Sequence, residues 1–162
     1  MASNGRLYDQ LDYEIIRLLN QDGRISASEI ARILKANPRT IRKRIDALVA
    51  SGAIIPTAIV NPTVFGYTTA VDIFLEVEHE FEKEVISRLL GMQEVSYLAY
   101  GQGSRDISIE ARFKNNGEMY DFVRNTLEAM PGVKVTRLVL VPRILRNINE
   151  WLPKKEDFLG ND

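Results

Sequence analysis

Apolar residues in the first third of the chain recur every three or four positions, the spacing of an amphipathic helix. This pattern predicts a first helix that begins at residue 9 or 12 and runs to about residue 21. A second helix is capped by Ser26, and Glu29 three residues later completes a capping box. With a third helix after a short turn, the segment has the layout of a helix-turn-helix.

The third predicted helix, residues 37–52, has one apolar and one basic face. Asn37 is a good N-cap, and Pro38 suits the first helical turn. The apolar face consists of Ile41, Ile45, Leu48 and Val49, and the other face carries Arg39, Arg42, Lys43 and Asp46. A helix in the DNA major groove needs this division, since one side packs on its domain and the other meets bases and phosphates. The alternative is a solvated charged face without a nucleic-acid role.

Beyond residue 66 the pattern changes to alternating apolar and polar positions. It predicts strands over residues 68–78, 94–100, 106–113 and 133–141 and helices over residues 81–91 and 117–130. The order βαββαβ is the ferredoxin-like split motif, in which both helices cover one face of an antiparallel sheet. The predicted fold class is α+β, with an N-terminal (winged) helix-turn-helix domain and a C-terminal ferredoxin-like domain.

Proline and glycine punctuate the chain at the joint between the two patterns. Residues 53–60 have the composition of a strand, which Pro56 limits to an edge or a bulged strand, either a small wing or the start of a linker. The predicted domains are a DNA-binding domain, a linker, an effector-binding and dimerisation domain, and a tail, over residues 1–60, 61–66, 67–142 and 143–162.

The tail and the second sheet face carry further apolar residues. In the tail, Trp151, Ile148 and Leu152 predict docking on the body or a neighbouring subunit, residues 154–162 are predicted to be loose, and residues 144–152 fit either helix or strand. The sheet face without helices is predicted to expose Phe74, Leu98, Tyr100, Leu138 and Leu140. A second copy covering this face would form a two-fold dimer, the symmetry that a palindromic DNA site requires.

Composition and charge narrow the class of protein. The chain has no cysteine, which excludes disulfides and thiolate metal sites and is compatible with a reducing cytoplasm. No apolar run is long enough for a membrane span, so we expect an intracellular, cytoplasmic protein without membrane contact. Residues 1–52 carry nine Lys/Arg and six Asp/Glu, a charge of +3, whereas residues 53–162 carry twelve and sixteen, a charge of −4. The anion-binding half is therefore the N-terminal one.

Nothing in the sequence predicts an enzyme. No cluster of acid/base or nucleophilic residues appears, and His79, the only histidine, lies between two glutamates without a second ligand or a nucleophile. The Gly101, Gly103 and Asp106 spacing approaches a dinucleotide-binding motif, but the third glycine is missing and the segment joins two strands. We expect no metal and no cofactor.

Both halves together resemble the Lrp/AsnC group, the leucine-responsive or feast/famine transcription regulators. The similarity spans nearly the whole chain and depends on the order and spacing of six pieces: Leu11-Asp12 with Ile15, Ile16, Leu18 and Leu19; Asp22-Gly23-Arg24-Ile25-Ser26; Ile30-Ala31; Arg44-Ile45 with Leu48 and Gly52-Ala53-Ile54; Phe65-Gly66; and Gly103-Ser104-Arg105-Asp106. The resemblance implies a DNA-binding helix-turn-helix and a domain that binds an amino acid, dimerises and builds octamers or larger rings.

In that family the effector binds between dimers near the turn that joins the second and third strands, at a Gly-Xaa-Xaa-Asp element. The corresponding residues here are Tyr100, Gly101, Gln102, Gly103, Ser104, Arg105 and Asp106. Glycines leave backbone N–H groups open to a carboxylate, and Asp106 can accept hydrogen bonds from an ammonium group. Gly101-Gln102 and Arg105 depart from the family pattern, and Arg105 fits either the ligand carboxylate or Asp106. A glycine hairpin with a purely structural aspartate is the alternative.

The sequence thus predicts a sequence-specific DNA-binding transcription regulator whose C-terminal domain binds an amino-acid effector and controls oligomerisation. Its partners are expected to be a palindromic DNA duplex, a free amino acid and further copies of itself, as a dimer that assembles to an octamer. The predicted DNA-binding residues are Ser26, Asn37, Pro38, Arg39, Thr40, Arg42, Lys43 and Arg44. The alternative is an architectural DNA-binding protein or an amino-acid-sensing assembly protein without specific operator control.

Overall fold

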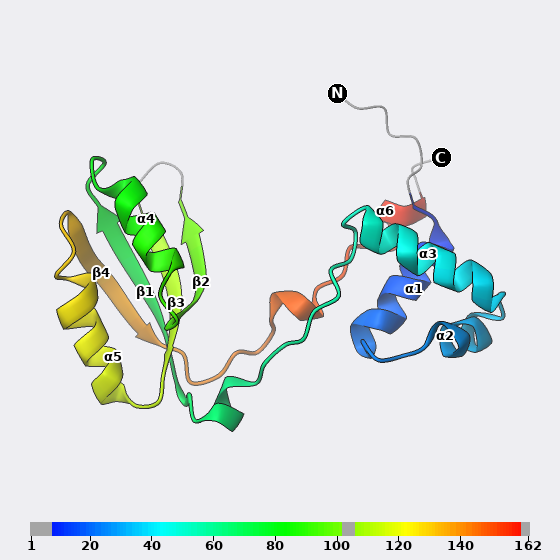
Figure 1. The fold of residues 1–162 in the computed structure, drawn as a ribbon, viewed down its shortest axis with the longest axis horizontal. Helices are drawn as coiled ribbons and strands as arrows, with labels where there is room; N and C mark the ends of the chain where they lie inside the picture. The colour runs from blue at the N-terminus through cyan, green and yellow to red at the C-terminus, as the bar shows by residue number, and fades with distance from the viewer. Residues whose placement is uncertain (1–7, 102–105, 160–162) are drawn as a thin grey trace. The chain divides into compact units, whose positions relative to one another are not determined.

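The computed structural model describes residues 8–101 and 106–159. The chain forms two compact units, of which one combines the described residues up to Ile59 with those from Leu145 onward, and the other is Val60–Ile144 (Figure 1). The tail, which the sequence pattern set apart, therefore belongs with the N-terminal unit.

Three helices form most of the N-terminal unit, as predicted: α1 Gln10–Gln21, α2 Ala27–Leu34 and α3 Pro38–Ala50. Their buried apolar side chains share one core, which consists of Ile15, Leu18, Ile30, Ala31, Ile41 and Leu48. Lys35, at the end of α2, has a left-handed backbone with φ 51°. This conformation turns the chain sharply into α3, so the two helices form the predicted helix-turn-helix.

Side chains cap the helix starts, but the reciprocal capping box lies on α1. The Asp9 carboxylate accepts a hydrogen bond from the Asp12 backbone N–H, and the Asp12 carboxylate accepts one from the Asp9 N–H. The box predicted on α2 is half formed. Ser26 Oγ accepts the Glu29 N–H at 3.1 Å, but the Glu29 carboxylate pairs with Arg32.

Residues 53–60 form no strand, and this prediction is wrong. A strand needs backbone groups to pair with, and the sheet that the described residues form contains only β1 to β4. Pro56 also lacks an N–H to donate. The chain continues into a 3₁₀ turn, Pro62–Phe65, and apolar side chains of the connection stay exposed, Ile55 at 81%.

The second unit is a four-stranded antiparallel sheet with helices on one face, as predicted. Its elements are β1 Thr69–Val77, α4 Glu82–Leu90, β2 Val95–Tyr100, β3 Asp106–Phe113, α5 Asn116–Phe122 and β4 Val133–Leu140. The strand order is β2-β3-β1-β4. The predicted helix over residues 117–130 is divided, because α5 gives way to a π-helical turn over Val123–Leu127.

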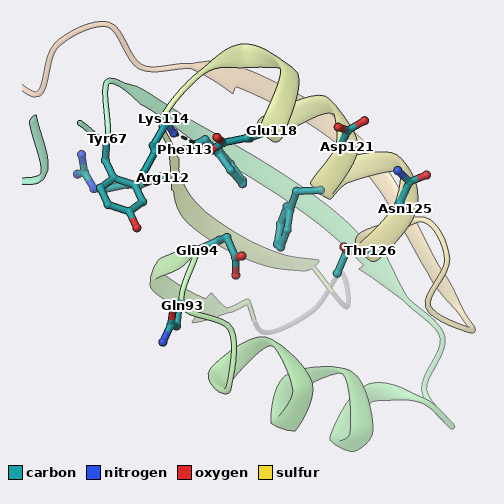
Figure 2. A pocket seen from close by; sticks show the side chains of 11 residues that line it. Tyr67, Gln93, Glu94, Arg112, Phe113, Lys114, Glu118, Asp121, Asn125 and Thr126 are labelled. Carbon is teal, nitrogen blue, oxygen red and sulfur yellow. Dashed lines mark hydrogen bonds between the residues drawn. The ribbon is translucent and has the colours of Figure 1, made fainter. Parts of the chain in front are cut away.

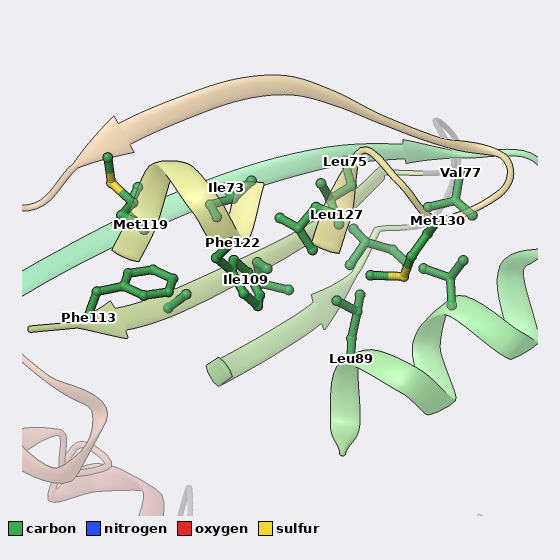
Figure 3. Packing of buried hydrophobic residues seen from close by; sticks show 14 residues of the cluster. Ile73, Leu75, Val77, Leu89, Ile109, Phe113, Met119, Phe122, Leu127 and Met130 are labelled. Atoms are coloured by element: carbon green, nitrogen blue, oxygen red, sulfur yellow. The ribbon is translucent and has the colours of Figure 1, made fainter. Parts of the chain in front are cut away.

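The core of this unit lies between the sheet and its helices (Figure 3). Alternate residues of β1 and β3 point into it, among them Ile73 and Ile109, both almost fully buried. Leu89 of α4 and Met119 and Phe122 of α5 close it from the other side. The period-two alternation that predicted these strands thus reflects one buried face.

The opposite sheet face differs from the prediction. Of the five apolar residues expected there, only Phe74 lies on it. The other four stand opposite core residues in the strand register, on the helix-covered side: Leu98, Tyr100, Leu138 and Leu140. The cause is an irregularity in each edge pairing, between Val95 and Tyr97 in β2 and opposite Phe74 and Leu75 in β4. A shift of one residue exchanges the two faces of a strand.

The uncovered face is consequently more polar than expected. Tyr97 stands opposite Glu110, and Val139 stands opposite Asp72. The Arg137 guanidinium lies 4.0 Å from the centre of the Phe74 ring. A cation–π contact of this kind keeps part of the apolar surface from water without a partner subunit.

The tail agrees with the prediction in part, because it belongs with the N-terminal unit. Within this unit Trp151 and Ile148 are exposed and Leu152 is half-buried, and docking of these residues on a neighbouring subunit stays a prediction. Residues 144–152 contain a 3₁₀ turn, Ile148–Glu150, in place of the expected helix or strand. The expectation of a loose segment after residue 154 is wrong for Phe158, which is 7% exposed. It belongs to a short helix, α6 Glu156–Leu159.

Candidate DNA-binding surface and effector site

The third helix, α3, presents basic side chains on the side away from its core. Asn37 caps it by accepting the Arg39 N–H at 2.8 Å, and Pro38 occupies the first turn. Its inward side chains, Ile41 and Leu48, are at most 1% exposed. Four predicted DNA-binding residues lie on the exposed side: Arg39, Thr40, Arg42 and Lys43. The three basic side chains among them, Arg39, Arg42 and Lys43, form no ion pair with another described residue.

Arg44 differs from its basic neighbours because it faces α1. Its Nη1 donates to Asp9 Oδ2 at 2.7 Å and to Asp12 Oδ2 at 2.9 Å. Asp12 is 4% exposed, so Arg44 neutralises a buried carboxylate. Its main role in this structure is to hold α3 against the start of α1. A contact of Arg44 with DNA stays a prediction.

The same contacts shift the pKa values of two of these groups. Partial burial raises the pKa of Asp9, but hydrogen bonds from the Arg44 guanidinium and from backbone N–H groups outweigh it, so the pKa lies below its ordinary value of 3.8. Hydrogen bonds to Asp9 and Asp12 raise the pKa of Arg44. Both shifts favour the charged pair.

A second contact holds the far end of α3. The Tyr8 hydroxyl donates to Ser51 Oγ at 3.1 Å, and Ser51 Oγ donates to the Leu48 carbonyl oxygen at 3.1 Å. The residues just before α1 therefore support α3 at two places, through Tyr8 and through Asp9. Sequence reasoning missed both contacts, because 35 and 43 positions separate the partners.

The predicted effector turn lies at one end of the β2–β3 pair. Tyr100 ends β2, Asp106 begins β3, and Tyr100 stands opposite Ile107. Gln102, Gly103, Ser104 and Arg105 lie outside the described residues. The two strands are antiparallel neighbours, so the segment joins them as the sequence predicted.

The described residues also form a cavity of about 530 Å³ at the other end of these strands (Figure 2). Glu94 precedes β2, Lys114 follows β3, and Glu118 comes from α5. The Glu118 carboxylate accepts the Lys114 N–H at 3.0 Å, and Lys114 Nζ lies 5.8 Å from the centre of the Tyr67 ring. The volume suits a small ligand. No local sequence pattern predicts this cavity, because its walls come from separate segments.

Within residues 8–101 and 106–159, no group of three histidine, cysteine, aspartate or glutamate side chains is placed to bind a metal ion. No helix in this part of the chain has the length and apolar character needed to cross a bilayer.

Comparisons with known proteins agree with this architecture. Residues 8–55 match a family described as winged helix-turn-helix DNA-binding, and residues 71–147 match the Lrp/AsnC ligand binding domain. The chain is 33% identical to the HTH-type transcriptional regulator FL11 of Pyrococcus abyssi, over 91% of this chain and 97% of the relative. It is also 33% identical to an uncharacterized HTH-type transcriptional regulator of Pyrococcus furiosus, over 90% and 96%.

Solved structures give the same answer for the fold. E. coli AsnC superposes with a TM-score of 0.77 at 23% identity, covering 87% of this chain and 97% of that one. A Pyrococcus furiosus member of the AsnC family superposes with a TM-score of 0.74 at 26% identity, covering 87% and 94%.

A DNA-binding helix-turn-helix joined to a ligand-binding α+β domain defines a transcription regulator, not an enzyme. The chain belongs to the Lrp/AsnC family of such regulators.

Replacing Arg44 by glutamine should destabilise the N-terminal unit by about 2 kcal/mol, because it leaves the buried Asp12 carboxylate without its charged partner. Urea unfolding followed by the loss of helical circular dichroism measures this difference. Arg42→Gln is the matched control, since Arg42 is exposed and should change stability by less than about 0.5 kcal/mol. Equal stabilities of the two variants would contradict a supporting role for Arg44.

The contribution of Asp9 to the free energy of unfolding should depend on pH. A carboxyl group with a lowered pKa in the folded state stabilises the fold above its unfolded pKa, and this stabilisation is lost as the pH falls through the folded value. Asp9→Asn should therefore be less stable than wild type at pH 6, and the difference should shrink as the pH falls below about 4. Asp46→Asn, at an exposed position of α3, serves as the control. A difference that stays constant from pH 6 to pH 3 would rule out the Asp9 pair as its cause.

Proposed function

We propose that this regulator binds specific DNA sequences through α3 and that a free amino acid, bound by its C-terminal domain, controls its oligomeric state. The observation that carries the proposal is the division of α3. Its inner side is buried and fixed by Arg44, whereas Arg39, Arg42 and Lys43 are exposed without ion-pair partners among the described residues.

The proposed DNA contact follows from the position of each residue on α3. A dimer places two copies of the helix in successive major grooves, about 34 Å apart on a palindromic site. Arg39 and Thr40, in the first turn, meet base edges, whereas Arg42 and Lys43 hold the register on phosphates. Ser26, Asn37 and Pro38 contribute near the two helix starts, and Arg44 acts through the position of α3.

The proposed dimer draws support from exposed apolar residues. Several of them follow one another between the end of α3 and the start of β1, namely Ile55, Ile59, Val60, Val64, Phe65 and Tyr67. A surface of this kind favours association with another protein surface. A second copy of the chain would bring the two-fold symmetry that paired half-sites require.

The proposed effector site is the 100–106 turn. Backbone N–H groups at its glycines suit the carboxylate of an amino acid, and Asp106 suits the ammonium group. The match to a ligand-binding domain supports a small-molecule effector. A Neisseria meningitidis transcriptional regulator with the same fold, TM-score 0.79 at 19% identity, has been solved as a complex with L-Met. The cavity beside Glu118 is a second candidate location for a ligand in this domain.

The effector would act through assembly. A ligand shifts an equilibrium only by its unequal affinity for the two states. An amino acid bound where dimers meet would favour one packing of dimers over another. Different assemblies present their α3 helices at different spacings, so operator affinity would change with ligand.

Arg39→Ala should weaken binding to a selected operator by about 1–3 kcal/mol and relax specificity at one position. Lys43→Ala should weaken binding to all sequences alike. It should also lower the slope of log affinity against log salt concentration by about one, because one fewer counterion is released. Titration of labelled duplexes at several salt concentrations measures both effects. Lys83→Ala, which removes an exposed charge from α4, is the control. The docking of α3 is refuted if Arg39→Ala and Lys43→Ala both keep wild-type affinity.

The melting temperature should rise with one or a few of the twenty amino acids, because a ligand that binds only the folded state stabilises it, by about 2.7 kcal/mol at a hundred times Kd. Asp106→Ala should abolish the shift, and Thr126→Val, in the cavity, should leave it unchanged. If Thr126→Val abolishes the shift and Asp106→Ala leaves it unchanged, the ligand binds in the cavity instead of at the 100–106 turn. No shift with any amino acid would favour an architectural DNA-binding protein.

A further inference from the structure

The tail returns to the N-terminal unit after the sheet domain is complete. The chain leaves this unit after Ile59, forms the whole second unit, and enters the first again at Leu145. The residues that dock, 148–159, lie beyond both family matches, which cover residues 8–55 and 71–147. The two family matches therefore do not describe this contact.

Two anchors attach the tail to α1. The main one is Phe158, which is buried against two aromatic rings of the N-terminal unit. Its ring centre lies 5.3 Å from that of Tyr13, edge to face, and 6.4 Å from that of Tyr8. The second anchor is Asn20, whose Nδ2 donates to the Asn149 carbonyl oxygen at 2.8 Å. The Asp157 carboxylate accepts the Lys154 N–H at 3.0 Å and so fixes the turn before Phe158.

The anchors meet the part of the unit that supports α3. Tyr8, which Phe158 contacts, donates its hydroxyl hydrogen bond to Ser51 at the end of α3. The next residue, Asp9, pairs with Arg44. A docked tail thus reaches α3 through the residues that set the position of that helix.

We propose that residues 145–159 form a strap, a second covalent connection that limits the orientations of the DNA-binding unit relative to the ligand-binding domain. The first connection, residues 53–61, contains no helix or strand and would by itself leave the unit wide freedom. Docking of Phe158 closes a loop through both units and removes much of this freedom. The two anchors must offset the conformational entropy lost when the strap becomes ordered.

Docking itself is tested in the full chain with Phe158→Ala and the control Ile148→Ala, which alters an exposed residue of the same strap. Trp151 is the only tryptophan, so its fluorescence anisotropy reports the motion of the strap. We expect Phe158→Ala to lower the anisotropy and to raise amide exchange in residues 8–13 and 145–159 at least tenfold, whereas Ile148→Ala changes neither. If Phe158→Ala changes neither, the strap is not docked.

The restraint is tested without DNA. The chain has no cysteine, so Ser28→Cys in α2 and Lys83→Cys in α4 place one spin label on each unit. Labelled chains are diluted with unlabelled ones to suppress distances between subunits. We expect a narrow distribution of label-to-label distances that broadens at least twofold in Phe158→Ala and stays narrow in Ile148→Ala. If the distance distributions of wild type, Phe158→Ala and Ile148→Ala are equally wide, the strap does not restrain the two units.

A DNA-binding measurement extends the same test, and it is the one measurement of the three that rests on the proposed function. Half-sites moved apart by half a helical turn should bind at least tenfold more weakly to wild type, and Phe158→Ala should reduce this penalty at least threefold. An unchanged penalty would overturn the control of α3 by the strap. If wild type binds no sequence specifically, the proposed function fails, whereas the spin-label distances still decide the strap.

Discussion

The position of α3 depends on one ion-pair cluster. The Arg44 guanidinium bridges Asp9 and the buried Asp12, and the Asp12 carboxylate also accepts the Asp9 N–H. One group of charges thus caps α1, compensates a buried carboxylate and ties α1 to the helix that faces outward with Arg39 and Lys43. Exposed ion pairs contribute little to stability, but this cluster contains a carboxylate that is 4% exposed, where an unpaired charge is costly. The geometry of the candidate DNA-binding surface follows from that constraint.

The parts of the fold that local rules determine could be predicted from the sequence. Asn37, Pro38 and the spacing of Ile41 and Leu48 fix α3, and period-two alternation fixes β1 and β3. The edge strands were less predictable, because a bulge changes which residues face the core without changing the composition of the strand. Leu138 shows the effect: it alternates as an outward residue by sequence, yet it stands opposite Ile73.

The same holds for the candidate sites: the features that local patterns determine could be predicted, and those that depend on distant residues could not. Exposed basic positions on α3 follow from helical periodicity, but the inward turn of Arg44 requires a partner 35 residues away in sequence. The cavity beside Glu118 and the burial of Phe158 against Tyr13 likewise join distant segments. Such contacts depend on tertiary packing, which no local pattern encodes. The residue types at these positions are common on solvated surfaces, so composition gave no signal either.

The first connection between the two units is poorly built to carry a ligand signal. Between Ala50 and Pro62 the chain has no helix or strand, and side chains such as Ile55 and Val60 contact little of their own chain. A segment of this kind cannot transmit a rigid-body movement. Under the proposed function, an effect of ligand would reach α3 either by altering how copies assemble or through the tail, which leaves β4 and ends against Tyr8 and Tyr13. The first route would require several subunits, whereas the second would operate within one chain. A ligand effect on DNA affinity that persists when the protein is diluted to monomers would therefore indicate the second route.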